Sequence, residues 1–248
     1  MPKFFYKLLL LLIVVALIFF FTKPSKNETD STEELLTEST TEDTPTVSYP
    51  PIVLDAGHGG IDPGKVGINN ALEKDINLSI VFKLKKLLEK EGFTVYLTRD
   101  SDKLLAAPNS TSQKKDDMIA RIEIVKEINP FFTISIHQNS FPDSSINGPQ
   151  VFYYKDSIES ATMAQVIQDI LNAQLEPPTK RAPQANTNYY LLTKTPTPTI
   201  IVECGFLSNP TEADLLIQDE YQDRVANAIF SGIISYYKAT TSNQILSE

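Results

Sequence analysis

The chain has 248 residues, enough for one sizeable α/β domain with a full hydrophobic core plus an appendage. Its formal net charge of −9 at pH 7 argues against a nucleic-acid partner, because no basic surface is available to release counterions from phosphates. The single cysteine, Cys204, excludes an internal disulfide and removes disulfides as an indication of compartment.

Residues 1–23 predict a membrane anchor or uncleaved signal. Lys3 and Lys7 precede an apolar run over residues 8–21. The run has the length of a signal-peptide core and is short for a spanning helix, which needs about 20 residues, although residues 4–6 extend it. Phenylalanines stand where a cleavage site needs small residues, so we expect an uncleaved anchor, with a cleaved signal as the alternative. An N-in orientation places the rest of the chain outside the membrane.

Residues 24–50 are rich in Ser, Thr and Glu and contain almost no aliphatic side chains. Such a composition cannot offset the entropy lost on ordering, so we expect a flexible acidic linker. A catalytic domain over residues 51–238 and a tail over residues 239–248 complete the predicted organisation.

From residue 52 onward, strand and helix patterns alternate, which is typical of βαβ units and a mostly parallel sheet. The patterns predict strands at 52–54, 93–98, 131–137, 150–154, 189–192 and 199–204. They predict helices at 73–91, with Gly92 as C-cap, at 114–128 and 158–175, from an Asn209 N-cap onward, and at 221–237. Residues 101–112 and 177–188 are expected to be loops, the second at the rim of the sheet.

Three residues form a candidate metal site. His58 follows the strand at 52–54, His137 ends the run at 131–137, and Glu73 opens a helix after a glycine-rich loop. Parallel sheets present functional groups beyond the carboxyl ends of their strands, so both histidines are expected on one rim. Two His and one carboxylate with an open fourth position are a catalytic zinc set, and mixed nitrogen and oxygen ligands suit zinc better than magnesium or calcium.

Each of these residues taken alone has an ordinary interpretation. A histidine at a strand end is usually a surface or satisfied core residue, and Glu73 could be a helix-start carboxylate favoured by the dipole. The conjunction of all three favours the metal site.

Glu203 ends a strongly apolar strand, where a carboxylate is costly unless it is paired. Either an ion pair to Arg181 or Arg121 explains it, or it serves as the base that a zinc hydrolase needs. Cys204 is better interpreted as a small buried strand residue than as a nucleophile, because no histidine remains to activate it once both bind metal.

Four ordered motifs resemble the zinc-dependent N-acetylmuramoyl-L-alanine amidases, type 3. They are D-x-G-H-G-G-x-D-P-G at 55–64, Glu73, S-I-H-x-N at 135–139 and V-E-x-G-F-x-x-N at 202–209, and the resemblance covers about residues 51–237. It implies a single three-layer αβα domain with a mostly parallel central sheet. It also implies that His58, Glu73 and His137 bind one Zn²⁺ and that Glu203 is the catalytic carboxylate.

The implied reaction is hydrolysis of the amide between N-acetylmuramic acid and L-alanine in peptidoglycan, in the cell envelope. Family members often depend on activator proteins, so such a partner is an open possibility. The anchor and the runs at 72–78, 135–140 and 188–192 are similar to the germination-specific branch, which removes stem peptides so that muramic-δ-lactam can form in the spore cortex.

Three further polar residues are candidate substrate contacts: Gln138, Asn139 and Asn188. They could equally orient the metal ligands, or be ordinary strand-end and loop residues. Two other functions stay open. One is a zinc peptidase that cuts within the stem peptide, for which Arg181 is the late candidate to bind a terminal carboxylate; the other is a non-catalytic wall-binding protein, against which Glu203 argues.

Overall fold

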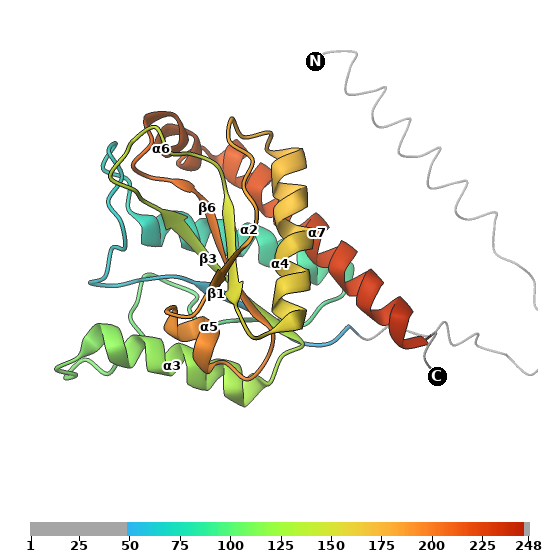
Figure 1. Cartoon of the computed structure of the whole chain (residues 1–248). Helices are drawn as coiled ribbons and strands as arrows, with labels where there is room; N and C mark the ends of the chain where they lie inside the picture. Colours follow the sequence, from blue (N-terminus) through green and yellow to red (C-terminus); the bar gives the residue numbers. More distant parts are fainter. Residues whose placement is uncertain (1–48, 246–248) are drawn as a thin grey trace, which may run out of the picture. The chain divides into compact units, whose positions relative to one another are not determined.

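The structure, a computed structural model, describes residues 49–245 (Figure 1). The predicted anchor at 1–23 and nearly all of the predicted linker at 24–50 lie outside the described residues. Within residues 49–245, no helix combines the length and apolar character that crossing a membrane requires.

A six-stranded sheet with the order β2-β1-β3-β6-β4-β5 forms the centre of the domain. Its strands are β1 (Ile52–Ala56), β2 (Val95–Leu97), β3 (Phe132–Asn139), β4 (Gln150–Tyr154), β5 (Gln184–Asn186) and β6 (Thr199–Phe206). The four strands β2, β1, β3 and β6 are mutually parallel, whereas β4 runs antiparallel to β6 and β5 runs parallel to β4. The predicted mostly parallel sheet is therefore confirmed.

Helices cover both faces of this sheet. Figure 1 shows α2 (Glu73–Glu91), α4 (Ile158–Gln174) and α7 (Asp219–Ile245) on one face, and α3 (Gln113–Ile128) with the short α5 (Tyr190–Lys194) on the other. The short α6 (Pro210–Leu216) follows β6. The main hydrophobic core lies under α2, α4 and α7, while the second face holds a small cluster of Phe152, Leu192 and Ile201.

Alternation along the central strands separates the two faces chemically. Alternate residues of β1, β3 and β6 enter the main core: Ile52, Leu54, Ala56, Phe132, Ile134, Ile136, Ile200, Val202 and Cys204. The residues between them include Asp55, Ser135, His137 and Glu203, which therefore lie on the face of α3 and α5. In register, Asp55 stands opposite Ser135 and His137 opposite Glu203. The polar positions of three strands thus form one cluster.

Two predicted caps are confirmed. Gly92 ends α2 with φ 108°, a left-handed conformation in which glycine is favoured. Asn209 caps α6, since its side chain accepts a hydrogen bond from the backbone N–H of Glu212, with Pro210 in the first turn.

The predicted strand at 189–192 is wrong, because α5 occupies this stretch. Leu191 and Leu192 are both buried, which neighbouring residues of a half-covered strand cannot be. The edge strand falls instead at β5, inside the stretch predicted as irregular, where it pairs with Phe152–Tyr154.

Several boundaries also differ. Helix α7 continues to Ile245, so residues 239–245 of the predicted tail are helical; they contain neither Gly nor Pro to end the helix. Strand β3 continues to Asn139, which places His137 inside the strand rather than at its end. At the other end, Tyr49 packs against Phe93 and Tyr237, so the domain begins before residue 51.

Candidate active site

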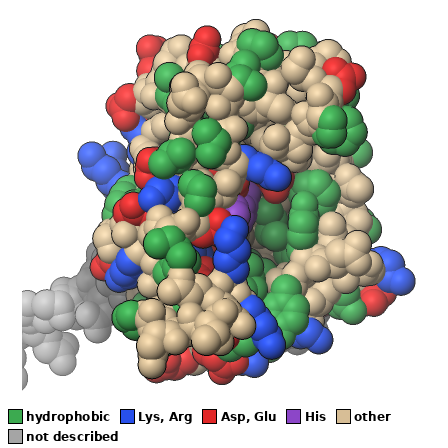
Figure 2. Space-filling model, turned by 90° about the vertical axis from the view of Figure 1, so that its left-hand side faces the viewer, with side chains coloured by type: hydrophobic (Ala, Val, Ile, Leu, Met, Phe, Trp, Pro, Cys, Tyr) green, Lys and Arg blue, Asp and Glu red, His purple; other side chains and the backbone are tan. Residues whose placement is uncertain are grey.

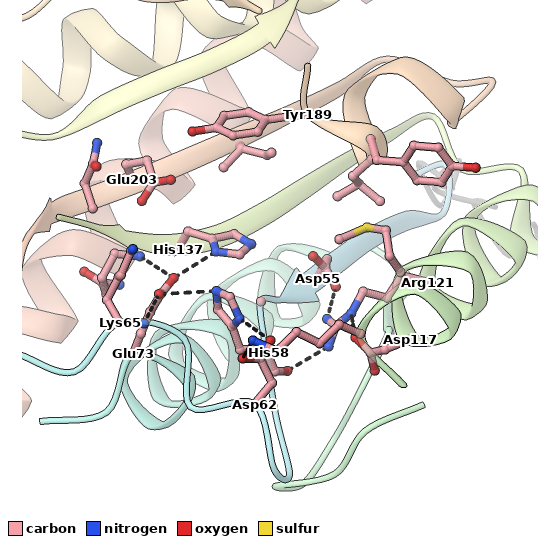
Figure 3. A pocket seen from close by; sticks show the side chains of 18 of the residues that line it. Asp55, His58, Asp62, Lys65, Glu73, Asp117, Arg121, His137, Tyr189 and Glu203 are labelled. Carbon is pink, nitrogen blue, oxygen red and sulfur yellow. Dashed lines mark hydrogen bonds and ion pairs between the residues drawn. The ribbon is translucent and has the colours of Figure 1, made fainter. Parts of the chain in front are cut away.

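Three side chains from separate elements converge at the carboxyl ends of β1 and β3 (Figure 3). His58 lies in the loop after β1, Glu73 is the first residue of α2, and His137 comes from β3. The His58 Nε2 atom is 3.2 Å from Glu73 Oε2, and the His137 Nδ1 atom is 2.9 Å from Glu73 Oε1. One donor atom from each residue lies within 4.8 Å of the others. The structure therefore brings together the three residues predicted as metal ligands.

The surroundings of these residues fit a zinc ion. Asp62 Oδ2 lies 2.8 Å from His58 Nδ1, so the carboxylate orients the ring and leaves Nε2 facing Glu73. The Glu73 carboxylate accepts hydrogen bonds from the backbone N–H groups of Lys65, at 2.7 Å, and Gln138, at 3.1 Å. Two imidazole nitrogens and an anchored carboxylate oxygen are a donor set that zinc accepts.

Two glycines permit this close arrangement. A Cβ atom on Gly57 would lie 2.1 Å from Cε1 of His137, inside the ring's van der Waals radius. Gly64 has φ 68°, and a Cβ atom there would lie 2.5 Å from Glu73 Oε2. The sequence indicated glycine here for turn conformation. The structure adds a second reason, because any side chain at these two positions would collide with a candidate ligand.

The Glu73 and His137 side chains form a buried ion pair. Burial raises the pKa of Glu73, but hydrogen bonds and charge from His137 and His58 outweigh it and lower that pKa well below its usual range. Burial alone lowers the pKa of His137, whereas its hydrogen bond to Glu73 and the Glu73 charge raise it to about 9. The Glu73 carboxylate therefore stays ionised beside the two histidines, as a metal ligand must be.

Glu203 faces His137 across the β3–β6 pairing and is only 8% exposed. Its Oε2 atom has no hydrogen-bond partner within residues 49–245. Burial, supported by the nearby Glu73 charge and opposed by His137 and His58, raises the pKa of Glu203 to about 7. A carboxyl group with such a pKa exchanges a proton readily near neutral pH.

The ion pair considered for Glu203 is absent from the described part of the chain, so that hypothesis is wrong. Arg121 pairs with Asp55 and Asp117, and the Arg181 Nε atom donates to the Asn147 carbonyl. Cys204 points into the main core on the opposite face, where burial raises the pKa of its thiol. This agrees with its interpretation as a buried strand residue.

A cleft of about 450 Å³ opens above these groups. Figure 2 shows the hollow, with histidine visible at its base and hydrophobic and basic side chains around it. Lys114 and Met118 of α3 line one part of it, and Tyr189, Tyr190 and Leu191 line another. Two lysines, Lys65 and Lys114, also line the cleft, and neither was predicted as a site residue. The loop and the helix that carry them come close to the metal ligands only in the folded chain.

The three predicted substrate contacts differ in position. Gln138 is buried, and its Nε2 atom donates to Asn77 Oδ1. Asn139 lines the cleft and accepts a hydrogen bond from the Ser140 N–H. Asn188 is exposed and is not among the residues that line the cleft; its N–H donates to Asn186 Oδ1.

Sequence reasoning also missed the part played by Asp62, which it included only as a motif letter. The residue contacts His58 Nδ1 because the loop between β1 and α2 folds back on itself, with paired hydrogen bonds between Gly59 and Asp62. The spacing of four residues between His58 and Asp62 in a glycine-rich loop was the available signal.

Comparisons with known proteins agree with this geometry. The family described as N-acetylmuramoyl-L-alanine amidase, Amidase_3, matches residues 52–235. The chain is 40% identical over 190 residues to the germination-specific N-acetylmuramoyl-L-alanine amidase of Bacillus subtilis (strain 168), covering 75% of this chain and 79% of that protein. The CwlD amidase of Clostridioides difficile, solved in complex with the GerS lipoprotein, has a similar structure, with a TM-score of 0.75, 38% identity and coverage of 77% and 100%. The catalytic domain of CwlV from Bacillus (Paenibacillus) polymyxa var. colistinus gives a TM-score of 0.68, 29% identity and coverage of 77% and 99%.

Proposed function

Because the chain belongs to the N-acetylmuramoyl-L-alanine amidase family and is a peptidoglycan amidase, we propose that it acts through one zinc ion and Glu203. His58, Glu73 and His137 hold the ion. The scissile bond is the amide between N-acetylmuramic acid and L-alanine of the stem peptide. The observation that carries this proposal is the convergence of the three donor side chains beside a buried carboxylate with an unpartnered oxygen.

Bound zinc supplies a Lewis acid that polarises the amide carbonyl and makes water more acidic. Glu203, which lines the cleft, takes the proton from the attacking water and passes it to the nitrogen of the departing L-alanine. In the metal-free chain burial raises the pKa of Glu203 to about 7, toward the range in which one carboxyl group can be deprotonated first and protonated afterwards.

The cleft provides the substrate contacts. Tyr189 and Tyr190 give it an apolar wall, against which sugar or peptide groups can pack. We assign Asn139 to substrate contact and Gln138 to orienting Glu73, because the Gln138 backbone N–H donates to that carboxylate and its side-chain amide donates to Asn77, which itself donates to Glu73. A contact from Asn188 remains a prediction for a substrate long enough to reach beyond the cleft.

The biological setting follows by similarity. The relative from B. subtilis is named germination-specific, and we propose that this chain removes stem peptides in the spore cortex so that muramic-δ-lactam can form. The CwlD amidase was solved with a lipoprotein, which supports an activator of that kind for this chain. Residues 1–23 as an anchor and 24–50 as a linker would place the catalytic domain outside the cytoplasm, in the cell envelope or the forespore intermembrane space.

The two alternative functions are less well supported. Peptidases of the carboxypeptidase kind usually carry an arginine beside the metal for the terminal carboxylate, but the predicted candidate, Arg181, donates to the Asn147 carbonyl and is not among the cleft residues. A wall-binding protein has no use for a buried carboxylate beside a metal site.

The test is to incubate the zinc-loaded full-length chain with purified peptidoglycan and to identify new amino termini by mass spectrometry. L-Alanine termini with intact glycan strands are expected from the wild type and not from His58→Ala. New termini elsewhere in the stem peptide would identify a peptidase instead. Wild-type protein that binds no zinc would contradict the metal assignment.

A further inference from the structure

Two arginines that play no part in the proposed chemistry lie beneath the site, each only 1% exposed. Together they donate hydrogen bonds to the carbonyl oxygens of residues 56–58, here called the carbonyl triplet. Arg99 donates from Nε to Ala56, at 2.8 Å, and from Nη2 to Gly57, at 3.1 Å. Arg121 donates from Nη1 to Ala56 and from Nη2 to His58, both at 2.7 Å.

The carbonyl triplet needs such support because of its backbone conformation. His58 has φ 62°, a left-handed conformation that residues other than glycine rarely adopt. Such a conformation persists only where the surrounding structure holds it. The N–H of Gly57 is also bound, to the carbonyl of Ile136, one residue before His137. The segment that presents His58 is therefore held by donors and an acceptor from three other parts of the chain.

Arg99 also reaches the element that carries the second ligand. Its Nη2 atom donates to the carbonyl of Lys74, at 2.7 Å, in the first turn of α2 directly after Glu73. Asn77 makes a parallel link, because its Nδ2 atom donates to the Gly57 carbonyl at 3.1 Å and lies 3.4 Å from Glu73 Oε1. One guanidinium thus spans the carbonyl triplet and the start of α2.

Arg121 connects the carbonyl triplet to the strand of the third ligand. Its Nη1 atom lies 2.6 Å from Asp55 Oδ1, and the other oxygen of Asp55 accepts a hydrogen bond from Ser135. Ser135 lies two residues before His137 on the same strand. The Nε atom of Arg121 donates to Asp117 on the same helix, which fixes the guanidinium plane (Figure 3).

We propose that Arg99 and Arg121 are positioning residues that set the spacing of His58, Glu73 and His137, a role that rests on the zinc site proposed above. A guanidinium presents several donors in one rigid plane, so it can fix two or three carbonyls relative to one another, which the single ammonium of lysine cannot. Burying two such cations is costly, and here all three nitrogens of each guanidinium donate hydrogen bonds, most of them to the segments that carry the candidate ligands.

The experiment compares Arg99→Lys and Arg121→Lys with wild-type full-length chain, using competition against a chromophoric chelator to measure zinc affinity. We expect each variant to bind zinc roughly tenfold or more weakly, as for other groups that orient metal ligands. Arg181→Lys is the matched control, because Arg181 also donates to a backbone carbonyl, that of Asn147, but is not among the cleft residues. Its zinc affinity should equal that of the wild type.

Two measurements separate positioning from simple loss of structure. Far-ultraviolet circular dichroism of the metal-free proteins checks that the variants fold. The visible absorption of the Co²⁺-loaded proteins reports ligand geometry and should change in Arg99→Lys but not in Arg181→Lys. If Arg121→Lys does not fold, Ser135→Ala replaces it, since it removes only the hydrogen bond from Ser135 to Asp55.

A folded Arg99→Lys protein with zinc affinity within twofold of wild type and an unchanged Co²⁺ spectrum would overturn the role of Arg99. Unchanged affinity in folded Arg121→Lys would overturn the role of Arg121, and unchanged affinity in Ser135→Ala would overturn its connection to the strand of His137. Failure of the zinc site itself gives a different result: wild-type protein would then bind zinc no better than His58→Ala.

Discussion

Glu203 is an unusual residue for the place it occupies. Its neighbours along β6 are buried, and one oxygen of its own carboxylate has no partner within residues 49–245. A buried polar atom without a hydrogen bond costs stability that a nonpolar side chain would not. The residue is therefore better explained by its proposed proton transfer than by any contribution to folding.

We expect Glu203→Gln to retain zinc and to lose turnover by at least about 100-fold, because an amide of nearly the same shape cannot accept the proton. Zinc content by elemental analysis and release of L-alanine termini from peptidoglycan would be measured on the same preparation. The unfolding temperature should not fall, since the substitution removes a buried ionisable group. Full activity in this variant would refute the general-base role.

Asp62 holds the His58 ring, so Asp62→Ala should weaken zinc binding by roughly tenfold or more. Lys114→Ala is the matched control, because Lys114 pairs with the other oxygen of Asp62 from an exposed position, with 75% of its side chain in solvent. Such a surface pair contributes little, and this variant should bind zinc almost normally. Equal losses in the two variants would show that Asp62 does not act through His58.

Among the elements, α3 covers its face of the sheet in an unusual way. The helix buries Ile122 and Val125, and it is also attached through Arg121, which pairs with Asp55 of β1. Asp55 also accepts hydrogen bonds from Thr98, after β2, and Ser135 of β3. A single carboxylate therefore joins α3 to three parallel strands. The face that carries the cleft thus combines a few apolar contacts with buried polar ones, whereas the opposite face is held by the main apolar core.

This attachment should make the metal-free protein sensitive to acid. Burial raises the pKa of Asp55, but Arg121 and the two hydroxyl donors outweigh it and lower the pKa from 3.8 to about 2. A carboxyl whose folded pKa is lowered stabilises the fold above its unfolded pKa, and this contribution is lost as pH falls through the folded pKa. The loss is about 2 kcal/mol, at about 1.4 kcal/mol per pKa unit, between about pH 4 and pH 2.

Urea unfolding of the metal-free wild type at several pH values over that range would measure this loss. Asp55→Asn, although less stable at neutral pH, should lose less stability on acidification, because it lacks the titrating group. An identical acid dependence in both proteins would show that Asp55 is not the group responsible.

At the scale of the whole molecule, the two sides of the sheet have different tasks. Helices α2, α4 and α7 bury the apolar side chains of β1, β3 and β6 in one continuous core. The other side carries the cleft and the candidate metal site between α3 and α5. Because the site uses residues from the loop after β1 and from α2, β3 and β6, it can form only when most of the domain has folded.

The aromatic contacts of Tyr49 place the beginning of the folded domain two residues earlier than predicted. Its ring centroid lies 4.3 Å from that of Phe93 and 5.1 Å from that of Tyr237. A fragment of residues 49–248 keeps both of these contacts. A 51–248 fragment should be less stable by about 1–3 kcal/mol, because each aromatic pair contributes about 0.5–1.5 kcal/mol. Equal stability of the two fragments would contradict a structural role for Tyr49.

The sequence by itself determined the fold class, the family and most of the elements. Alternating strand and helix patterns predicted the mostly parallel sheet, because local periodicity reports which side chains are buried. Motif order along 52–235 was sufficient to identify the amidase family. The strand predicted at 189–192 is a helix in the structure. Two adjacent leucines suit a strand or a helix equally well, so tertiary packing decides between them.

Only the tertiary structure decided how the site is assembled. Sequence spacing could nominate His58, Glu73 and His137, but their convergence depends on strand register and on the close approach that Gly57 and Gly64 permit. Sequence reasoning expected a possible Arg121 partner for Glu203, whereas in the structure this arginine binds Asp55. The reason is physical: a hydrogen bond between residues far apart in the chain depends on distances of a few tenths of an ångström, and such distances exist only once the strands and helices have packed.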